Sequence, residues 1–373
     1  MSERNNILII RLDAIGDMIM FSAFIRELRH QEPDAEITLV ISPLVKNIYI
    51  NCPYVDKILY FDGRRKIKPQ IITSTFRAMI WGLSDLKEKY SIAMLPRAGA
   101  DAEGALMLAI MSGAKDIISF SEKQTAERSI TNRGYDRFVT RKIITSTTQH
   151  EVETTLNFLR QAGYEDIKND NIEMWFSENQ REVKKVDQIL EQKNIQPENI
   201  LIGVGFSAAQ AHRCWPIDKF KELFEIIISK DPNARFILIG GPEDKPTAEA
   251  LVENSENILS FAGEVSLLET ACLLKRCSLY IGNDSGPMHI AAVVKTPVIE
   301  ISCFPKNGDK DHDNSPLRFG PWKTKNIILQ PESTLLPCDC FCKSNTPHCI
   351  NQITPNDVYK SYKEILKTQR ISK

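Results

Sequence analysis

The stretch Ser278-Leu279-Tyr280-Ile281-Gly282-Asn283-Asp284-Ser285-Gly286-Pro287-Met288-His289 begins as a β-rich run and opens through small polar residues into an apolar helix. Free backbone N–H groups at a helix start, with the positive end of the helix dipole, favour a bound anion such as a phosphate. Ser285 and Gly286 let a ligand approach the backbone, while Asp284 and His289 add a hydroxyl-binding carboxylate and a hydrogen-bonding imidazole. Ordinary helix capping by these residues is the competing interpretation.

A second strand, turn and helix of this kind stands near the N-terminus. The apolar run Ile7-Leu8-Ile9-Ile10 suits a buried parallel strand, and Arg11-Leu12-Asp13-Ala14-Ile15-Gly16-Asp17 leads from it into an apolar-periodic helix. This is the opening of a Rossmann-like unit, but the glycine fingerprint of dinucleotide sites is absent, which counts against a nicotinamide-dependent enzyme. Asp17 is either a first-turn carboxylate that suits the helix dipole or a general base directed into a cleft.

Length and composition limit the classes of protein to consider. A chain of 373 residues, of which 42% are hydrophobic, suggests two domains with a core each. The formal net charge of -1 gives no indication of nucleic acid as a partner. The N-terminus lacks a signal-peptide pattern, and no apolar run approaches the roughly 20 residues of a membrane span. We therefore expect a cytoplasmic protein, and the scattered cysteines (Cys52, Cys214, Cys272, Cys277 and Cys303) form no disulfide framework.

Strand-like runs alternate with helical ones along the chain, which is typical of an α/β protein with parallel sheets. The expected strands lie at 7–10, 37–41, 57–61 and 91–95, and after a polar stretch the pattern restarts at 200–205, 235–241, 258–261, 278–281 and 298–301. We expect a first domain over 1–176, a linker over 177–199, a second domain over 200–352 and a C-terminal helical segment over 353–373. Two doubly wound domains that face each other form a cleft in which ligands bind.

Several motifs together resemble glycosyltransferase family 9, the heptosyltransferase-like enzymes that build lipopolysaccharide core. Residues 7–17 resemble the family's N-terminal motif, and residues 261–269 followed by 284–292 resemble its donor-domain signature. Four further motifs follow one another along the chain in the order expected of the family: His150-Glu151-Val152-Glu153, Trp215-Pro216, Phe319-Gly320-Pro321-Trp322 and Ile353-Thr354-Pro355. The resemblance implies a GT-B fold: an acceptor domain first, a nucleotide-sugar domain second, and a C-terminal helix that crosses back to the first domain.

The chemistry implied by this resemblance is an inverting glycosyl transfer. The donor is a nucleotide sugar, with ADP-heptose as the first candidate, and the acceptor is a lipopolysaccharide or another surface glycan. In the family the base is the aspartate of a Gly-Asp pair, which is Asp17 after Gly16 in this chain, and Asp13 is the second choice. The scheme requires no cofactor and no divalent metal.

The resemblance also assigns the donor site, in which we include Gly16. Ser285, Gly286 and the helix that begins there would bind the departing diphosphate. Asp284 would then bind ribose or sugar hydroxyls, and His289 the phosphate or a donor hydroxyl.

Two donor positions depart from the family pattern. Arg213 stands where the family has a lysine before the Trp-Pro pair, and Asp244 stands where it often has a ribose-binding glutamate. Both replacements keep the sign of the charge. A nucleotide-sugar-binding protein without turnover stays an alternative on these departures, as does a nucleotide-sugar epimerase of the same fold.

Two basic segments in the first half are candidates for the acceptor. Arg64, Arg65 and Lys66 form a basic run after a predicted strand, and Arg128 lies in a second segment with excess positive charge. They would bind anionic sugars, phosphates or membrane headgroups, which suggests a glycan or glycolipid acceptor and peripheral contact with the inner membrane. Solvated charged loops are the alternative.

A cysteine group near the C-terminus has no place in this scheme. Cys338, Cys340, Cys342 and Cys349 lie within twelve positions of one another, beside His348, but their spacing differs from the paired Cys-x-x-Cys of zinc sites. A structural metal or iron–sulfur cluster, disulfide or redox chemistry, and free thiols all stay open, and we predict no metal ligand with an essential role.

Overall fold

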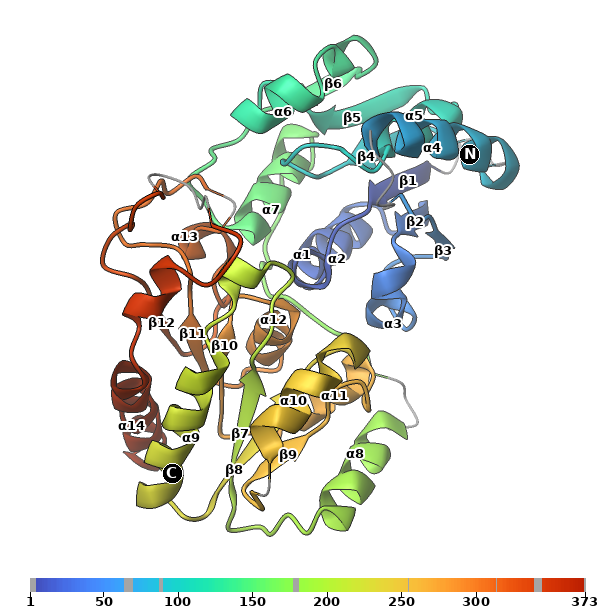
Figure 1. Ribbon diagram of the computed structural model, residues 1–373. Coiled ribbons are helices and arrows are strands. Elements are labelled where there is room, and N and C mark those ends of the chain that lie inside the picture. The colour runs from blue at the N-terminus through green and yellow to red at the C-terminus, as the bar shows by residue number, and fades with distance from the viewer. Residues whose placement is uncertain are drawn as a thin grey trace. The chain divides into compact units, whose positions relative to one another are not determined.

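The computed structural model describes residues 5–63, 70–86, 90–176, 181–253, 255–312, 314–338 and 344–371. The chain divides into two compact units, Met1–Trp175 and Phe176–Lys373, and each contains one six-stranded sheet with helices on both faces (Figure 1). The α/β class and the two Rossmann-like sheets predicted from the sequence are confirmed. The cleft between the units stays a prediction.

The sheet of the first unit has the strand order β3-β2-β1-β4-β5-β6, and every pairing is parallel. Its strands are β1 (Asn6–Arg11), β2 (Glu36–Ile41), β3 (Lys57–Tyr60), β4 (Ile92–Leu95), β5 (Asp116–Phe120) and β6 (Arg141–Ile143). The strand order reverses between β1 and β4. Ligands of open α/β sheets bind beyond the carboxyl ends of such strands, so the residues after Arg11 and Leu95 occupy the expected site.

Helices cover both faces of this sheet, as its almost fully apolar central strand requires. They are α1 (Ile15–Met20), α2 (Ser22–Gln31), α3 (Lys46–Tyr49), α4 (Gln70–Asp85), α5 (Ala105–Met111), α6 (Ala126–Thr131) and α7 (Glu151–Gln161), with short 3₁₀ turns at Pro43–Val45 and Tyr135–Arg137. Leu8 and Ile10 pack in one buried cluster with Leu106 and Leu108 of α5. Elsewhere α2 packs on α7, where the rings of Phe24 and Phe158 lie 6.1 Å apart.

The second unit repeats the design, with the parallel strand order β12-β11-β10-β7-β8-β9. Its strands are β7 (Ile200–Gly205), β8 (Ala234–Ile239), β9 (Ile258–Ser260), β10 (Leu279–Asn283), β11 (Val298–Ile301) and β12 (Asn326–Leu329). The order reverses between β7 and β10. The Asp-Ser-Gly turn that follows β10 therefore lies at the switch point of this sheet.

Two layers of helices enclose the second sheet. They are α8 (Arg181–Gln192), α9 (Ile217–Lys230), α10 (Lys245–Val252), α11 (Leu267–Leu274), α12 (Gly286–Val293), α13 (Pro316–Phe319) and α14 (Pro355–Ile371), with 3₁₀ turns η3 (Ala211–Arg213), η4 (Pro242–Asp244) and η5 (Cys349–Gln352). One core cluster joins Ile202 and Val204 of β7 to Phe224 of α9 and Tyr362 of α14. Glycines in the strands permit close packing, because a Cβ at Gly282 would lie 2.5 Å from the carbonyl oxygen of Gly205.

The polar, helix-prone stretch expected to connect the two domains forms a helix. Much of the segment expected as a linker, 177–199, is helix α8, whose Val186 and Leu190 are buried and which packs on α11. This helix therefore belongs to the second unit. Helix α14 packs on α9, β11 and β12 of the same unit, and its expected return to the first domain stays a prediction.

Candidate active site

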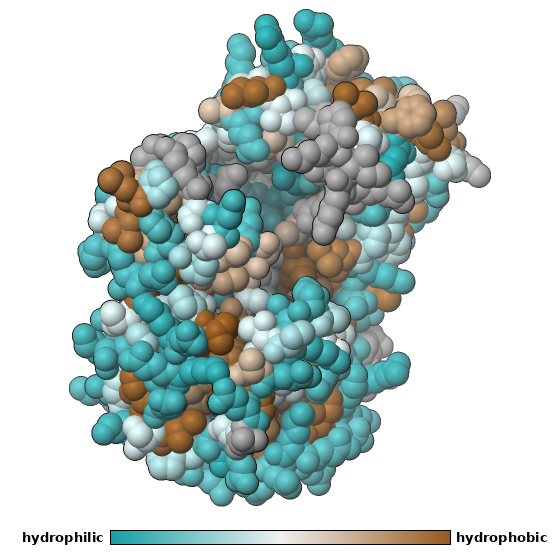
Figure 2. Space-filling model, viewed as in Figure 1, coloured by the Kyte–Doolittle hydropathy of each residue, from teal (hydrophilic) through white to brown (hydrophobic). Residues whose placement is uncertain are grey.

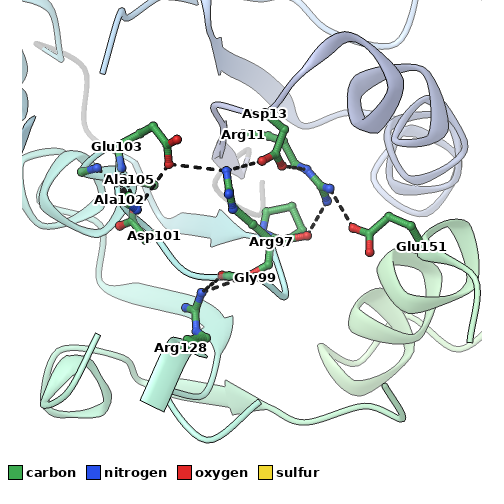
Figure 3. Close-up of polar contacts among 12 residues, drawn as sticks. Arg11, Asp13, Arg97, Gly99, Asp101, Ala102, Glu103, Ala105, Arg128 and Glu151 are labelled. Carbon is green, nitrogen blue, oxygen red and sulfur yellow. Dashed lines mark hydrogen bonds and ion pairs between the residues drawn. The ribbon is translucent and has the colours of Figure 1, made fainter. Parts of the chain in front are cut away.

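The guanidinium of Arg11, the last residue of β1, is buried in a network of charges (Figure 3). Its side chain is 1% exposed; Nε donates to Asp13 Oδ2 at 2.5 Å, and Nη2 donates to Glu151 Oε1 at 2.7 Å. Nη1 donates to the carbonyl oxygen of Pro96. A buried charge needs such partners, because an uncompensated ion in the interior costs several kcal/mol. Arg11 thus joins the loop after β1 to the loop after β4 and to the start of α7.

Asp13 bridges two arginines from different loops. Its Oδ2 accepts from Arg11, and its Oδ1 accepts from Arg97, which follows β4 and also lies 3.4 Å from Glu103 Oε2. Both oxygens of Asp13 are therefore engaged, and the residue is only 4% exposed. This geometry suits a carboxylate that holds positive charge better than one that accepts a proton from a substrate.

Asp17 lies in the first turn of α1 and is partly exposed. Burial and the neighbouring charge of Asp13 raise the pKa of its carboxyl group to about 7, although Arg11 acts in the opposite direction. A group with a pKa near neutrality both accepts and releases protons at physiological pH, as a general base must. Of the two carboxylates predicted for catalysis, Asp17 has the electrostatic character of a base. Gly16 is buried in the same turn, and its contact with a donor stays a prediction.

Arg128, predicted to bind the acceptor, is 2% exposed and binds backbone oxygens. Its guanidinium donates to the carbonyl oxygen of Gly99 at 2.6 Å (Figure 3) and to that of Phe120 at 3.0 Å. These contacts hold the loop that carries Arg97. A pocket beside this loop is lined by Ile10, Leu12, Leu95, Arg97, Asp101, Glu103, Ala105 and Arg128. Direct acceptor binding by Arg128 stays a prediction, and Arg64, Arg65 and Lys66 lie outside the described residues.

In the second unit, Arg213 and Asp284 form an ion pair at the carboxyl ends of β7 and β10. Arg213 Nη2 lies 2.6 Å from Asp284 Oδ2 and donates to the Asp284 carbonyl oxygen at 2.7 Å. The two side chains are 20% and 8% exposed. Because β7 and β10 are neighbours, the turns after them meet, and the sequence prediction that groups these residues agrees with the geometry.

His289 stands in α12 on the other side of Asp284. Its Nε2 lies 3.9 Å from Asp284 Oδ1, and burial lowers its pKa to about 4, so that the imidazole is neutral at physiological pH. Three buried nitrogen atoms near this aspartate have no hydrogen-bond partner among the described residues: the donors Nε of Arg213 and Nδ2 of Asn283, and Nδ1 of His289, whose role depends on the tautomer. Buried polar groups in native proteins are normally paired, so these atoms suit a ligand rich in acceptor oxygens.

The start of α12 has the form expected of an anion site. Ser285 is the residue before the helix, and its side chain does not cap the backbone N–H groups; its hydroxyl donates to the carbonyl oxygen of Asn283 at 3.3 Å. Gly286 is the first helical residue, so no side chain covers the backbone there. Pro287 has no N–H, and the N–H of Met288 donates to the Ser285 carbonyl oxygen at 3.0 Å, so an anion in this position would contact the backbone N–H of Gly286.

Asp244 is engaged in local structure. Its Oδ2 accepts from the backbone N–H of Gly241 at 2.8 Å and from the Ser207 hydroxyl at 2.9 Å. The carboxylate thus ties the turn after β8 to the segment after β7. Its predicted contact with ribose stays a prediction.

The sequence analysis missed Glu300, a carboxyl group inside β11. It is 1% exposed, and its Oε2 has no partner among the described residues. Burial and the charge of Asp284 raise its pKa well above the ordinary value, because both disfavour the charged carboxylate. The signal in the sequence was a single acid in an apolar strand. Nothing in the sequence, however, placed it beside Asp284 and Arg213.

Two of the four clustered cysteines, Cys338 and Cys349, lie together with His348, and the possible ligand atoms of all three are within 4.8 Å of one another. Cys340 and Cys342 lie outside the described residues.

Comparisons with known proteins identify the family of the chain. Residues 102–341 match the family model described as glycosyltransferase family 9 (heptosyltransferase). The lipopolysaccharide heptosyltransferase 1 of Campylobacter coli is 26% identical over 96% of this chain and 98% of its own length.

Solved structures show the same fold. The glycosyl transferase family 9 protein of Veillonella parvula superposes with a TM-score of 0.75 at 20% identity, covering 99% of both chains. The ADP-heptose lipopolysaccharide heptosyltransferase II of E. coli gives 0.69 at 17% identity, over 98% of this chain and 99% of that one. The family model spans more than half of the sequence. The chain therefore belongs to glycosyltransferase family 9, the heptosyltransferases, and is a glycosyltransferase of the GT-B fold.

Proposed function

We propose that the chain transfers a heptose from ADP-heptose to a lipopolysaccharide-core acceptor, with inversion at the anomeric carbon and no divalent metal on the diphosphate. The proposal draws on the family and on relatives whose names describe lipopolysaccharide heptose transfer. Within the chain, the observation that carries it is the raised pKa of Asp17 beside the ion-paired Asp13 at the end of β1.

In the proposed reaction, the carboxylate of Asp17 takes the proton of an acceptor hydroxyl. The acceptor oxygen attacks the anomeric carbon, and the bond from that carbon to the diphosphate oxygen breaks, so that ADP leaves with the electron pair. A single displacement inverts the anomeric configuration. The acceptor would occupy the pocket beside Arg97 and Glu103, where side chains of both charges are available for sugar hydroxyls and phosphates.

The second unit supplies the groups that stabilise the leaving diphosphate. Arg213 is a cation with an unused buried N–H, and the start of α12 presents the backbone N–H of Gly286 without a side-chain cap. Neutral His289 is able to donate a hydrogen bond. Donors that are already in place when negative charge develops lower the barrier to its formation. The positive charge of Arg213 also stabilises the leaving diphosphate, as a divalent metal does in other sugar transferases.

We further propose that the protein works at the cytoplasmic face of the inner membrane. Within the described residues, no helix is both long and apolar enough to span a membrane. Helix α4 nevertheless exposes Ile72, Phe76, Ile80 and Leu83, which are 53–68% exposed and recur at helical spacing. Figure 2 shows apolar side chains at the surface over this helix. In the sequence the helix directly follows the basic run that contains Arg64, and apolar and basic residues together favour an anionic lipid surface.

Replacing the base tests the proposed reaction. Asp17→Asn removes the proton acceptor but keeps the size of the side chain, so kcat should fall at least about 100-fold while ADP-heptose affinity stays within about twofold. Release of ADP with an extracted core acceptor, without added divalent ion, measures turnover, and calorimetry measures binding. Asp218→Asn, which changes a first-turn carboxylate of α9, is the matched control and should keep activity. Unchanged turnover in Asp17→Asn would support a different base or a binding protein without turnover.

The pH profile tests the same group independently. Only the deprotonated carboxylate accepts a proton, so a pKa of about 7 for Asp17 predicts that kcat/KM rises about tenfold per pH unit below pH 7 and levels off above it. The residual activity of Asp17→Asn should not show this rise of kcat/KM below pH 7. A wild-type profile that is flat between about pH 5.5 and 8 contradicts the assignment.

Arg213 should dominate the affinity for ADP. Arg213→Ala removes a charge-assisted contact with the diphosphate, which predicts a Kd about 10-fold to 100-fold higher, and Arg213→Lys should recover part of the loss because it keeps the charge. Arg235→Ala, at a position where the side chain contacts only nearby carbonyl oxygens, is the control. Equal ADP affinity in wild type and Arg213→Ala, measured by calorimetry, would show that the diphosphate does not bind to Arg213.

Membrane contact predicts that the full chain sediments with vesicles of phosphatidylethanolamine and phosphatidylglycerol at low salt. The double variant Phe76→Glu/Ile80→Glu places charge on the apolar face of α4, so the bound fraction should fall several-fold. Leu317→Glu, at an exposed apolar position of α13, should bind as wild type does. Equal sedimentation of all three proteins, or none by the wild type, rejects the role of α4.

A further inference from the structure

Side chains from two places in the C-terminal segment converge on one point. Cys338 lies after β12, and His348 and Cys349 lie at the start of η5, ten and eleven residues later. Nδ1 of His348 is 3.6 Å from the Cys338 sulfur and 3.4 Å from the Cys349 sulfur. The three possible ligand atoms all lie within 4.8 Å of one another, and both sulfurs belong to buried residues.

Hydrogen bonds alone do not account for this arrangement. The Nδ1 atom of an imidazole either carries one proton or offers one lone pair, so it forms one strong hydrogen bond and not two. Here two sulfurs lie at nearly equal distance from the same nitrogen. One ion bound between the three atoms explains all three positions at once.

The two nitrogen–sulfur distances agree with those of a tetrahedral zinc site. Zinc–sulfur and zinc–nitrogen bonds of about 2.3 and 2.0–2.1 Å, at a tetrahedral angle, place sulfur and nitrogen about 3.6 Å apart. The observed distances are 3.4 and 3.6 Å. Two thiolates and an imidazole are the donors that zinc prefers, whereas magnesium and calcium prefer oxygen.

We propose that Cys338, His348 and Cys349 bind a structural Zn²⁺ ion through two thiolates and the imidazole Nδ1. A tetrahedral ion takes four ligands, so one position remains for a water molecule or another side chain. None of these three residues is among the groups proposed to bind the diphosphate, and the proposal does not depend on the identity of the sugar donor.

The contacts of η5 indicate what the ion stabilises. Ile350 and Ile353 enter the core cluster of the second unit. The carbonyl oxygen of Ile353 accepts from Nε1 of Trp215 at 3.0 Å, and the backbone N–H of Trp215 donates to Asn283 Oδ1 at 2.9 Å. Trp215 follows Arg213 by two residues. Zinc would therefore hold the segment that supports the turns after β7 and β10.

Metal analysis of the untagged full chain, purified without chelators, tests the site. We expect about one zinc ion per chain. Cys349→Ser and His348→Ala should each lower the zinc content at least fivefold, whereas Cys272→Ser, which changes a buried cysteine of α11, should leave it unchanged. Zinc removal should lower the Tm of the wild type and of Cys272→Ser but not that of Cys349→Ser.

Cobalt substitution provides a readout that does not require folded variants. Co²⁺ added to zinc-depleted wild type should produce thiolate-to-metal charge-transfer absorption, which one equivalent of Zn²⁺ should abolish. Absence of metal from the purified chain together with absence of this absorption overturns the proposal. A Cys338–Cys349 disulfide detected by peptide mass spectrometry, or full zinc content in Cys349→Ser, overturns it as well.

Discussion

The buried guanidinium of Arg11 is the group on which the site of the first unit depends. It lies at the end of the central strand and is neutralised by Asp13 and Glu151, which come from the following turn and from α7. Breaking a buried pair by removing one partner typically costs 3–5 kcal/mol, because the remaining charge stays uncompensated. The network therefore holds three separate segments together near Asp17, which lies in the first turn of α1. In the second unit, Arg213 and Asp284 join the turns after two neighbouring strands in the same manner.

Pairing and burial give nearby carboxylates different properties. Asp13 has guanidinium groups on both oxygens, while Asp17 is affected mainly by burial and by the charge of Asp13, which raise its pKa. The second unit shows the same division: Asp284 is paired with Arg213, whereas burial raises the pKa of Glu300. Acids whose environments separate their pKa values are able to perform separate tasks, such as accepting a proton and holding a cation in place.

The fold was largely predictable because the central strands are continuous apolar runs. Residues 7–10 and 278–281 identified β1 and β10, and the turns after them contain Asp17 and Asp284. The sequence analysis did not predict β5, β6 and β12. Of these, β6 and β12 are short edge strands that contain polar residues, because an edge strand need not be buried on both faces. Helix α8 was interpreted as a linker because only a narrow stripe of it is apolar.

The partners of the site residues were less predictable than the residues themselves. Glu151 follows Arg11 by 140 positions, and Glu300 reaches Asp284 only because β11 pairs with β10. Such contacts depend on strand order, which one sequence does not specify.

A crystal structure of the full chain with ADP and a core acceptor tests the account most directly. We predict the diphosphate on Arg213 and the start of α12, with the Asp17 carboxylate about 3 Å from the acceptor hydroxyl. A structure in which the acceptor hydroxyl contacts another base, with Asp17 remote from it, would contradict the account.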